Sequence, residues 1–534
     1  MFLIYYLLIL LSIVGYGNAL SKILSLNTTN FGFLGILGIS FLTLISYVSS
    51  LFISHGYFFN ILILLLGLIF FLMNFEKKNI RSFLKLLAIF IILIIFIYVK
   101  KNHDDFGYYH FPYISIITQI EHPIGLGQLN NGFRNHSSIF FLSSLFYLPL
   151  VGINLLHIAP VYFLGFSNFI FLEYVKDKKI FNKFKFINFF ALLVFSFVNI
   201  FFYRLAEHGT DRSGMILIFL LTLLILSLQN IKFEKIDHKK IYFILILTTL
   251  LISLKTYYII YIPLVFYAII SVNISFILRL LKIKTFYYCL IFFIITIFYN
   301  FINSGCLIYP ALLTCFDNLY WSLDSNVIIE TNIWYELWAK AGATPEFVVK
   351  NRSEYIENFN WLSNWIENYF FNKVSDFILG LIAISVIFLF IFKSKSENFL
   401  SSKYKYIYIL SLIFLLYLIF WFMKHPALRY GGYHIFAILV FLYLCILLNN
   451  YKITFNTFYK KSILIILITS FVFFGRNVHR VIKENKIYGQ NSFINYQYDY
   501  DKVFYNRYLD IIYKDKKLYK KYYILGKEFL ITKN

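Results

Sequence analysis

Charged residues are scarce in this sequence. They make up 14% of the 534 residues, whereas hydrophobic residues make up 60%, and the mean hydropathy is +0.72. Charged residues account for roughly a quarter of a typical soluble domain. The composition therefore excludes an ordinary soluble domain and indicates a polytopic membrane protein.

Several motifs that mark enzyme classes are also missing. The sequence has no CxxC or HExxH zinc pattern, and without a GxxxxGK[ST] loop ATP hydrolysis has no support. It has only four cysteines, of which Cys289 and Cys445 fall in predicted helices and are expected to pack there. Cys306 and Cys315 lie in a predicted outer loop, where an oxidising compartment would permit a disulfide.

Long apolar runs dominate what is present. Because a helix needs about 20 mainly apolar residues to cross a bilayer, they predict an all-α polytopic membrane protein with about 13–14 transmembrane helices. No basic residue precedes the first run, so we expect a retained helix rather than a signal peptide. The runs lie near residues 2–17, 31–53, 57–75, 83–99, 155–175, 187–203, 214–229, 241–254, 257–272, 286–302, 375–393, 406–422, 433–449 and 462–474.

The net charge of +23 is distributed in a way that argues against nucleic-acid binding. Most Lys and Arg residues fall in short loops near residues 77–81, 176–185, 232–240, 279–284, 393–405 and 452–461, which are separated by even numbers of predicted spans. Such loops mark the cytoplasmic side of a membrane protein. The loops at 100–154, 204–213, 303–374 and 423–432 then share the opposite, outer face.

The outer face carries an unusual polar stretch, "KNHDDFGYYHFP", directly after an apolar run. The plain interpretation of Asp104 and Asp105 is a solvated loop that ends a helix. The alternative is catalytic, because a carboxylate held among aromatic groups at the membrane surface can deprotonate an attacking hydroxyl.

Cations are predicted at the same level. Arg429 and Lys255 stand at outer helix ends, where they could pair with the oxygens of a lipid phosphate. Either one could instead extend from its apolar stem into the headgroups. Their predicted position on one face with Asp104 and Asp211 favours a phosphate site.

The order of these stretches resembles the GT-C superfamily of membrane glycosyltransferases, which includes dolichyl-phosphate-mannose mannosyltransferases and aminoarabinose transferases. Asp104, Asp105 and Tyr108 match the D-[DE]-x-x-Y motif of the first outer loop, and "RNHSSI" from Arg134 stands where the family commonly has K-P-P-L. "YRLAEHGTDRSGM", "LLISLKTYY" and "FWFMKHPALRYGG" resemble later outer segments of the family. The sequence is also similar to a group of large bacterial membrane proteins that look GT-C-like themselves.

The resemblance implies transfer of a sugar from a polyprenyl-phosphate donor to an envelope glycan, lipid or protein, on the outer face of the cytoplasmic membrane. Asp104 and Asp105 would be catalytic, and a divalent cation is left open. The implied substrate-binding residues are Tyr108, Arg134, His136, Arg204, Asp211, Lys255, Lys424, His425 and Arg429. The partners are the lipid bilayer, the donor and the acceptor, with no nucleic acid.

The resemblance divides the chain into three parts. Residues 1–80 would be additional N-terminal helices, 81–475 the GT-C-like core, and 476–534 a polar tail that span counting places outside. The basic start of this tail, with Arg476, Arg480, Lys483 and Lys486, argues for the cytoplasm instead, so its side stays open. The loop at 303–374 contains two tryptophan pairs spaced four apart, Trp334/Trp338 and Trp361/Trp365, expected in interfacial helices or stacked on sugar rings.

Two other functions stay open. A transporter or flippase would need ionisable groups facing a pathway at the bilayer midplane. An O-antigen polymerase or ligase would be expected to carry its key groups in a large late loop.

Overall fold

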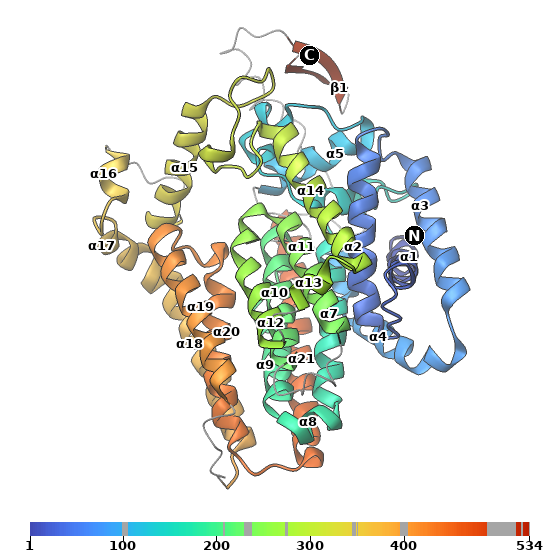
Figure 1. The fold of residues 1–534 in the computed structure, drawn as a ribbon, viewed down its shortest axis with the longest axis vertical. Coiled ribbons are helices and arrows are strands. Elements are labelled where there is room, and N and C mark those ends of the chain that lie inside the picture. The colour runs from blue at the N-terminus through green and yellow to red at the C-terminus, as the bar shows by residue number, and fades with distance from the viewer. Residues whose placement is uncertain are drawn as a thin grey trace.

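The computed structural model describes ten segments of the chain, which are residues 1–98, 105–206, 209–228, 238–272, 276–343, 349, 351–395, 404–488, 519–524 and 527–532. These residues are mostly helical, as the apolar runs predict (Figure 1). In an apolar environment a helix satisfies its own backbone hydrogen bonds, so each long run becomes one continuous helix.

The first four helices form a group at one side of the molecule (Figure 1). They are α1 (Phe2–Ile23), α2 (Phe31–Ser50), α3 (Tyr57–Asn74) and α4 (Ile80–Leu93). Glycines let α1 and α2 touch along their backbones, since a Cβ added at Gly17 would lie 1.8 Å from the Leu34 carbonyl oxygen. The group is joined to the rest because α2 also packs on α7. The proposed division at residue 80 stays a prediction.

The centre of the bundle is occupied by helices that are buried on nearly all sides. In α7 and α10, 94% of the apolar window is buried inside the protein, and α10 stands in the middle of the bundle (Figure 1). These two helices therefore form the core on which the others pack. The central and following helices are α7 (Ala159–Lys176), α8 (Lys178–Phe184), α9 (Phe186–Phe201), α10 (Gly209–Leu228), α11 (Lys239–Leu254), α12 (Ile262–Val272), α13 (Phe276–Leu280) and α14 (Lys284–Ser304).

The remaining long helices stand at the edge and behind the core. They are α18 (Ser375–Phe392), α19 (Lys405–Lys424), α20 (Gly432–Asn449) and α21 (Phe455–Tyr488). A two-stranded antiparallel sheet, β1 (Tyr519–Ile524) with β2 (Lys527–Thr532), lies at the upper end in Figure 1.

In the described chain, eleven helices are long and apolar enough to cross a membrane, or twelve if α8 and α9, which meet at a 117° bend, form one broken span. This supports a polytopic membrane protein, but with fewer spans than the 13–14 expected. The difference arises partly because the run at 257–272 begins as a 3-10 turn, η8 (Thr256–Tyr261), and continues as the short α12. α11 is also only 16 residues long.

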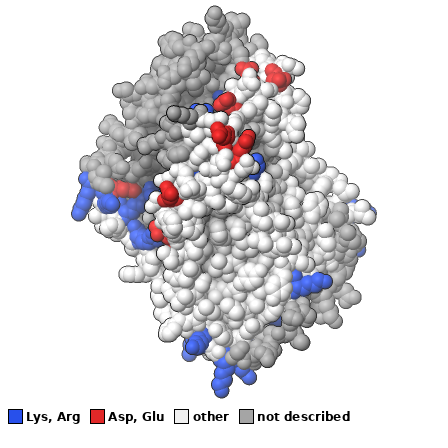
Figure 2. Space-filling view, turned by 90° about the vertical axis from the view of Figure 1, so that its left-hand side faces the viewer, with Lys and Arg blue, Asp and Glu red and all other residues white. Residues whose placement is uncertain are grey.

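Short elements gather at one end of the bundle, drawn at the top of Figure 1. In this end Cys306 and Cys315 are joined by a disulfide. Figure 2 shows Asp and Glu side chains toward this upper end, and Lys and Arg both at the lower end and, on the left of that view, at mid-height close to some of the acids. The short elements of the outer loops are η3 (Phe106–His110), α5 (Phe111–Gln119), η4 (Leu126–Gln128), η5 (Asn131–Phe133), α6 (Ser138–Ser144), η6 (Ile153–Leu155), η9 (Leu312–Thr314), α15 (Ser325–Lys340), α16 (Arg352–Ile356), α17 (Leu362–Trp365), η10 (Ile366–Val374) and η12 (Leu428–Tyr430). Two further turns, η1 (Lys77–Asn79) and η2 (Ile94–Ile97), flank α4.

Candidate functional site

Four of the predicted site residues come together at the upper end of the bundle. Asp105 directly precedes η3, Asp211 lies in the first turn of α10, Lys255 follows the last residue of α11, and Arg429 lies in η12. We call these four residues the charge cluster. Each stands where a long helix begins or ends, or in the turns that lead into one.

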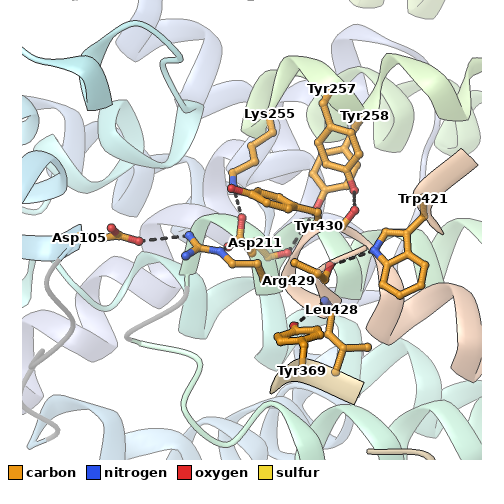
Figure 3. A network of polar contacts seen from close by, with 11 residues as sticks. Asp105, Asp211, Lys255, Tyr257, Tyr258, Tyr369, Trp421, Leu428, Arg429 and Tyr430 are labelled. Atoms are coloured by element: carbon orange, nitrogen blue, oxygen red, sulfur yellow. Dashed lines mark hydrogen bonds and ion pairs between the residues drawn. The ribbon is translucent and has the colours of Figure 1, made fainter. Parts of the chain in front are cut away.

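Arg429 is the centre of the charge cluster (Figure 3). Its Nη2 group donates a hydrogen bond to Oδ2 of Asp105 at 3.1 Å, and its Nε lies 3.3 Å from Oδ2 of Asp211. The Nζ group of Lys255 donates to the other carboxylate oxygen of Asp211. Positive and negative groups thus alternate along the cluster, and their formal charges cancel.

The cluster is shielded from solvent to different degrees. The side chain of Asp211 is 5% exposed and that of Lys255 17%, against 26% for Asp105 and 29% for Arg429. Burial works to lower the pKa of Arg429, but Asp211, together with Tyr430 and Asp105, raises it well above its ordinary value. The start of α10 also favours the negative charge of Asp211, because a helix N-terminus is electropositive. The guanidinium is therefore a fixed cation, with Asp105 on its more open side.

The loop that carries Arg429 is fixed by aromatic side chains (Figure 3). The Nε1 groups of Trp365 and Trp421 each donate at 2.9 Å, to the carbonyl oxygens of Pro426 and Ala427. On either side of Arg429, the Tyr369 hydroxyl accepts from the Leu428 amide at 2.8 Å and the Tyr257 hydroxyl donates to the Tyr430 carbonyl at 3.1 Å. These bonds hold the short turn of η12 and so position the guanidinium.

Helix α15 contributes a second set of contacts. The Arg429 guanidinium lies 5.4 Å from the centre of the Trp338 ring, within cation–π range. Two residues earlier, Glu336 accepts from Lys340 at 2.6 Å and lies 3.6 Å from the Nζ of Lys424. The helix thus lies against the site through Trp338, one of the tryptophans noted for their spacing, and through Glu336, which the sequence did not single out.

The other predicted binding residues lie around the charge cluster or outside it. Arg134 donates to the Thr331 hydroxyl of α15 at 3.1 Å and to the Gly127 carbonyl at 3.4 Å. Tyr108 is half-buried, with its carbonyl accepting from Asn130. Arg204 is exposed, and it lies close enough to Arg480 of α21 for the two positive charges to repel each other.

His425 stands next to the loop of Arg429. Its ring centre lies 5.8 Å from that of Tyr430. Burial lowers the pKa of His425, although the nearby Glu336 carboxylate works to raise it. His425 is therefore a mainly neutral neighbour of the charge cluster.

His136 has a different environment from the one expected. Its side chain is buried, with Nδ1 at 3.1 Å from Oδ1 of Asn300 and Nε2 at 3.1 Å from the Tyr47 hydroxyl. Burial lowers its pKa to about 3, so the ring is neutral. Both ring nitrogens have partners within the protein. The contact of His136 with a donor phosphate stays a prediction.

A related set surrounds His122. The Tyr113 hydroxyl lies 2.9 Å from Nε2 of His122 and accepts from Asn303 at 3.1 Å. Together with His136, Asn300 and Tyr47, these residues form what we call the histidine network. It links the first outer loop to α2 and α14.

The tryptophan pairs also differ from expectation. Trp361 and Trp365 are buried inside the protein, with ring centres 6.1 Å apart, so neither ring is exposed to lipid headgroups. Trp334 is exposed, and Trp338 packs on Arg429. The spacing in "NIWYELW" and "NWLSNW" shows that the two members of each pair share a helix face. It does not show whether that face is buried or exposed.

Asp104 lies outside the described residues. Within the described part of the chain, no three His, Cys, Asp or Glu side chains come close enough to hold a metal ion. Asp105 and Asp211 are each paired with a cation instead, so this donor set does not fit a divalent ion.

A small hollow adjoins the start of α10. It is lined by residues that include His110, Ser143, Gly209 and Thr210, next to Asp211 in the sequence. Its space is about that of one water molecule. A sugar or a phosphate does not fit this hollow, so a substrate would have to approach the charge cluster from its exposed side.

Comparison with known proteins gives one result. No curated protein and no solved structure matches the chain. A family model described as "Domain of unknown function (DUF8201)" matches residues 1–436, which include all four members of the charge cluster. The chain therefore belongs to the DUF8201 family.

Proposed function

We propose that the protein is a membrane glycosyltransferase that moves a sugar from a polyprenyl-phosphate donor to an envelope glycan, lipid or protein. The reaction would take place on the outer face of the cytoplasmic membrane. One observation carries the proposal, namely that carboxylates and cations from four distant segments meet at one end of a bundle of apolar helices. This arrangement combines a base with an anion-binding group at the ends of apolar helices, where a lipid phosphate would lie.

Asp105 is the proposed base. Its carboxylate accepts the proton of an acceptor hydroxyl while that oxygen attacks the anomeric carbon of the donor sugar. The bond between this carbon and the phosphate oxygen breaks, and the polyprenyl phosphate leaves with the bonding electrons. Asp105 is suited to this role because its side chain is the more exposed of the two described carboxylates in the cluster.

Arg429 and Lys255 are the proposed phosphate-binding groups. A guanidinium has five N–H donors, and Arg429 directs Nη2 and Nε toward Asp105 and Asp211. Its Nη1 group has no hydrogen bond or ion pair to the described residues, so it remains available to a phosphate oxygen. Positive charge at this position stabilises the leaving group as negative charge develops.

Asp211 has an orienting part in this scheme. It binds Lys255 through one oxygen and faces Arg429 with the other. Asp211 therefore holds both cations close together, one at each oxygen of its carboxylate. The geometry gives Asp211 no open oxygen for proton transfer, which leaves that task to Asp105 or to Asp104.

A transporter or flippase is less well supported by this geometry. Such a protein would need ionisable groups in the middle of its spans. Asp211 and Lys255 instead stand at the first turn of α10 and just beyond the end of α11. A polymerase or ligase of O-antigen type is disfavoured because Asp105 belongs to the early loop.

The test is the surface glycan profile, measured by mass spectrometry, of cells whose only copy carries Asp105→Asn or Asp211→Asn. Glu330→Gln is the matched control, since this carboxylate is 68% exposed in the outer loop and pairs with an exposed Arg352. We expect a sugar that the parent adds to be missing in both aspartate variants and present in the control. A glycan that changes on deletion of the gene but not in these variants would contradict the proposal.

A further inference from the structure

The upper end of α21 carries a basic face that the charge cluster does not use. Exposed Arg476, His479, Lys483 and Lys486 follow one another at spacings of three, four and three residues. This spacing places them along one side of the helix. We call these four residues the basic face of α21.

The basic face lies at the same end of the molecule as the charge cluster. Arg476 donates from Nη1 to the Ile200 carbonyl at 2.8 Å, and its guanidinium lies 3.8 Å from the centre of the Tyr203 ring. Ile200 lies near the end of α9, shortly before α10 begins with Asp211. On another side, Phe473 packs on Phe96, in the turn that leads toward Asp105. The upper end of α21 thus stands beside both chain segments that lead to the described carboxylates of the cluster.

The exposed surface of α21 changes abruptly along its length. Leu464, Leu467, Ile468, Phe471 and Phe474 are exposed and apolar, as expected of a helix that faces lipid. The stretch between Lys461 and Arg476 is only about 22 Å long at 1.5 Å per residue, shorter than the roughly 30 Å hydrocarbon core. In an untilted span that begins near Lys461, Arg476 would therefore have to extend its side chain outward to reach the headgroups, whereas Lys483 and Lys486, about 33 and 38 Å along the helix, would lie at or beyond headgroup level.

In the part of the chain that the structure describes, carboxylates do not neutralise this surface. The acid of this stretch, Glu484, is bound by the mostly buried Arg480 at 2.7 Å. Arg476, Lys483 and Lys486 form no ion pair with the described residues. Three cations that form no ion pair with the described residues, near the expected level of the headgroups, fit a ligand with a phosphate group.

We propose that the basic face of α21 binds the phosphate headgroup of an anionic phospholipid, in the leaflet next to the charge cluster. The partner is the bilayer itself. Lys and Arg usually gather on the cytoplasmic side, so a basic helix end beside a site on the opposite side needs an anionic partner of its own. This inference does not depend on the chemistry proposed for the charge cluster.

The experiment uses the full-length protein in nanodiscs that contain either photoreactive phosphatidylglycerol or photoreactive phosphatidylcholine with the same acyl chain. After illumination, peptide mass spectrometry locates the lipid adducts. We expect phosphatidylglycerol to label the peptides around residues 200–206 and 476–486 about fivefold or more above phosphatidylcholine. The excess should fall as salt is raised, because screening weakens the attraction.

Two variants complete the test. Arg476→Gln with Lys483→Gln and Lys486→Gln should remove the excess, whereas the matched variant Arg476→Lys with Lys483→Arg and Lys486→Arg should keep it. Equal labelling by both lipids in the parent would overturn the proposal, even if the glutamine variant failed to fold. An excess that survives the glutamine substitutions, or that appears only at the opposite end of the bundle, would also overturn it. These three outcomes are independent of the glycan profile of the Asp105 and Asp211 variants.

Discussion

The charge cluster and the histidine network stand at the same end of the protein, and both draw on residues of the first outer loop. They differ in charge and access. The cluster contains four ionised groups, with Arg429 and Asp105 about one quarter exposed, whereas His122 and His136 are buried and their pKa values are lowered to about 3 by burial. The cluster can therefore exchange partners with an incoming anion. In the histidine network, both ring nitrogens of His136 and Nε2 of His122 have partners within the protein, whereas Nδ1 of His122 and Oδ1 of Asn303 have none among the described residues. Its contacts join helices.

This difference separates two kinds of polar residue in a mostly apolar protein, those that support the fold and those that are candidates for function. A buried neutral group that is fully hydrogen-bonded lowers the cost of its own burial and needs no further explanation. Four charges held together cost more to desolvate, and hydrophobic residues of similar volume would often be at least as stable. The charge cluster is therefore the better candidate for function, and the following experiments would break or sharpen this contrast.

The largest effect on stability is expected for Asp211→Asn. The substitution leaves Lys255 and Arg429 without the carboxylate that lies between them, in a place where the Asp211 side chain was 5% exposed. Removing one partner of a buried ion pair typically costs about 3–5 kcal/mol. Thermal unfolding of the purified protein in detergent should show a large fall in Tm. The double variant Asp211→Asn with Lys255→Met should recover part of it, and an additive loss would contradict the pairing.

Arg429→Gln is expected to affect transfer more than folding. The glutamine keeps a polar side chain in the loop but removes the positive charge beside the leaving phosphate. Loss of one such stabilising group typically lowers the rate by about 10²–10³-fold. The rate of glycan modification in cells measures it. Arg352→Gln is the control, because Arg352 is 55% exposed and pairs with an exposed glutamate. Equal activity of the two variants would remove Arg429 from the mechanism.

His136→Phe should have the opposite pattern. The phenylalanine fills a similar volume but leaves Asn300 and Tyr47 without their bonds to the ring. We expect a loss of about 1–3 kcal/mol in stability, because buried polar groups lose partners. The glycan profile should be unchanged in cells grown at low temperature. His136→Asn, which can still donate to Asn300, should lose less. A missing sugar with a normally folded His136→Phe protein would move this residue into the site.

The histidine network also predicts a pH dependence of stability. The folded pKa values of His122 and His136 are about 3, below the ordinary value of 6.5, so the unfolded chain takes up protons first. The contribution of these two residues to the free energy of unfolding is fully present above about pH 6.5. It falls as the pH drops toward 3, by up to about 1.4 kcal/mol per pH unit for each residue. Melting curves between pH 7 and about pH 5 should show this slope, reduced in His136→Asn. A flat profile in the parent would contradict neutral burial.

The sequence could predict the helical membrane fold and much of the charge cluster. Apolar length predicts helices directly, and loop charge predicts which helix ends share a face, which was enough to group Asp105, Asp211, Lys255 and Arg429. It could not predict that Arg429 pairs with Asp105, because 324 residues separate them and the pairing depends on how the helices pack.

Other features depend on packing that spacing cannot reveal. His136 and Arg134 are close in sequence and equally polar, yet only His136 is fully buried against α2 and α14. Trp361 and Trp365 share a spacing with Trp334 and Trp338, yet one pair is inside the protein. The role of α15 could not be predicted because its site contacts involve ordinary residues of an amphipathic helix. In each case the deciding interaction joins segments distant along the chain.

The smallest effect is expected for Trp365→Phe, and it tests how the cluster is held. This substitution keeps most of the buried aromatic volume but removes the hydrogen bond from Nε1 to the Pro426 carbonyl. The loss in stability should be about 1 kcal/mol, the ordinary net value of one hydrogen bond. If this bond positions Arg429, transfer should fall further than the change in Tm implies, since a small displacement of a charged group costs rate. Trp334→Phe, at an exposed ring on α15, is the matched control. Equal effects of both substitutions on transfer would mean that Arg429 is held by the remaining aromatic contacts, or that its exact placement does not limit the rate.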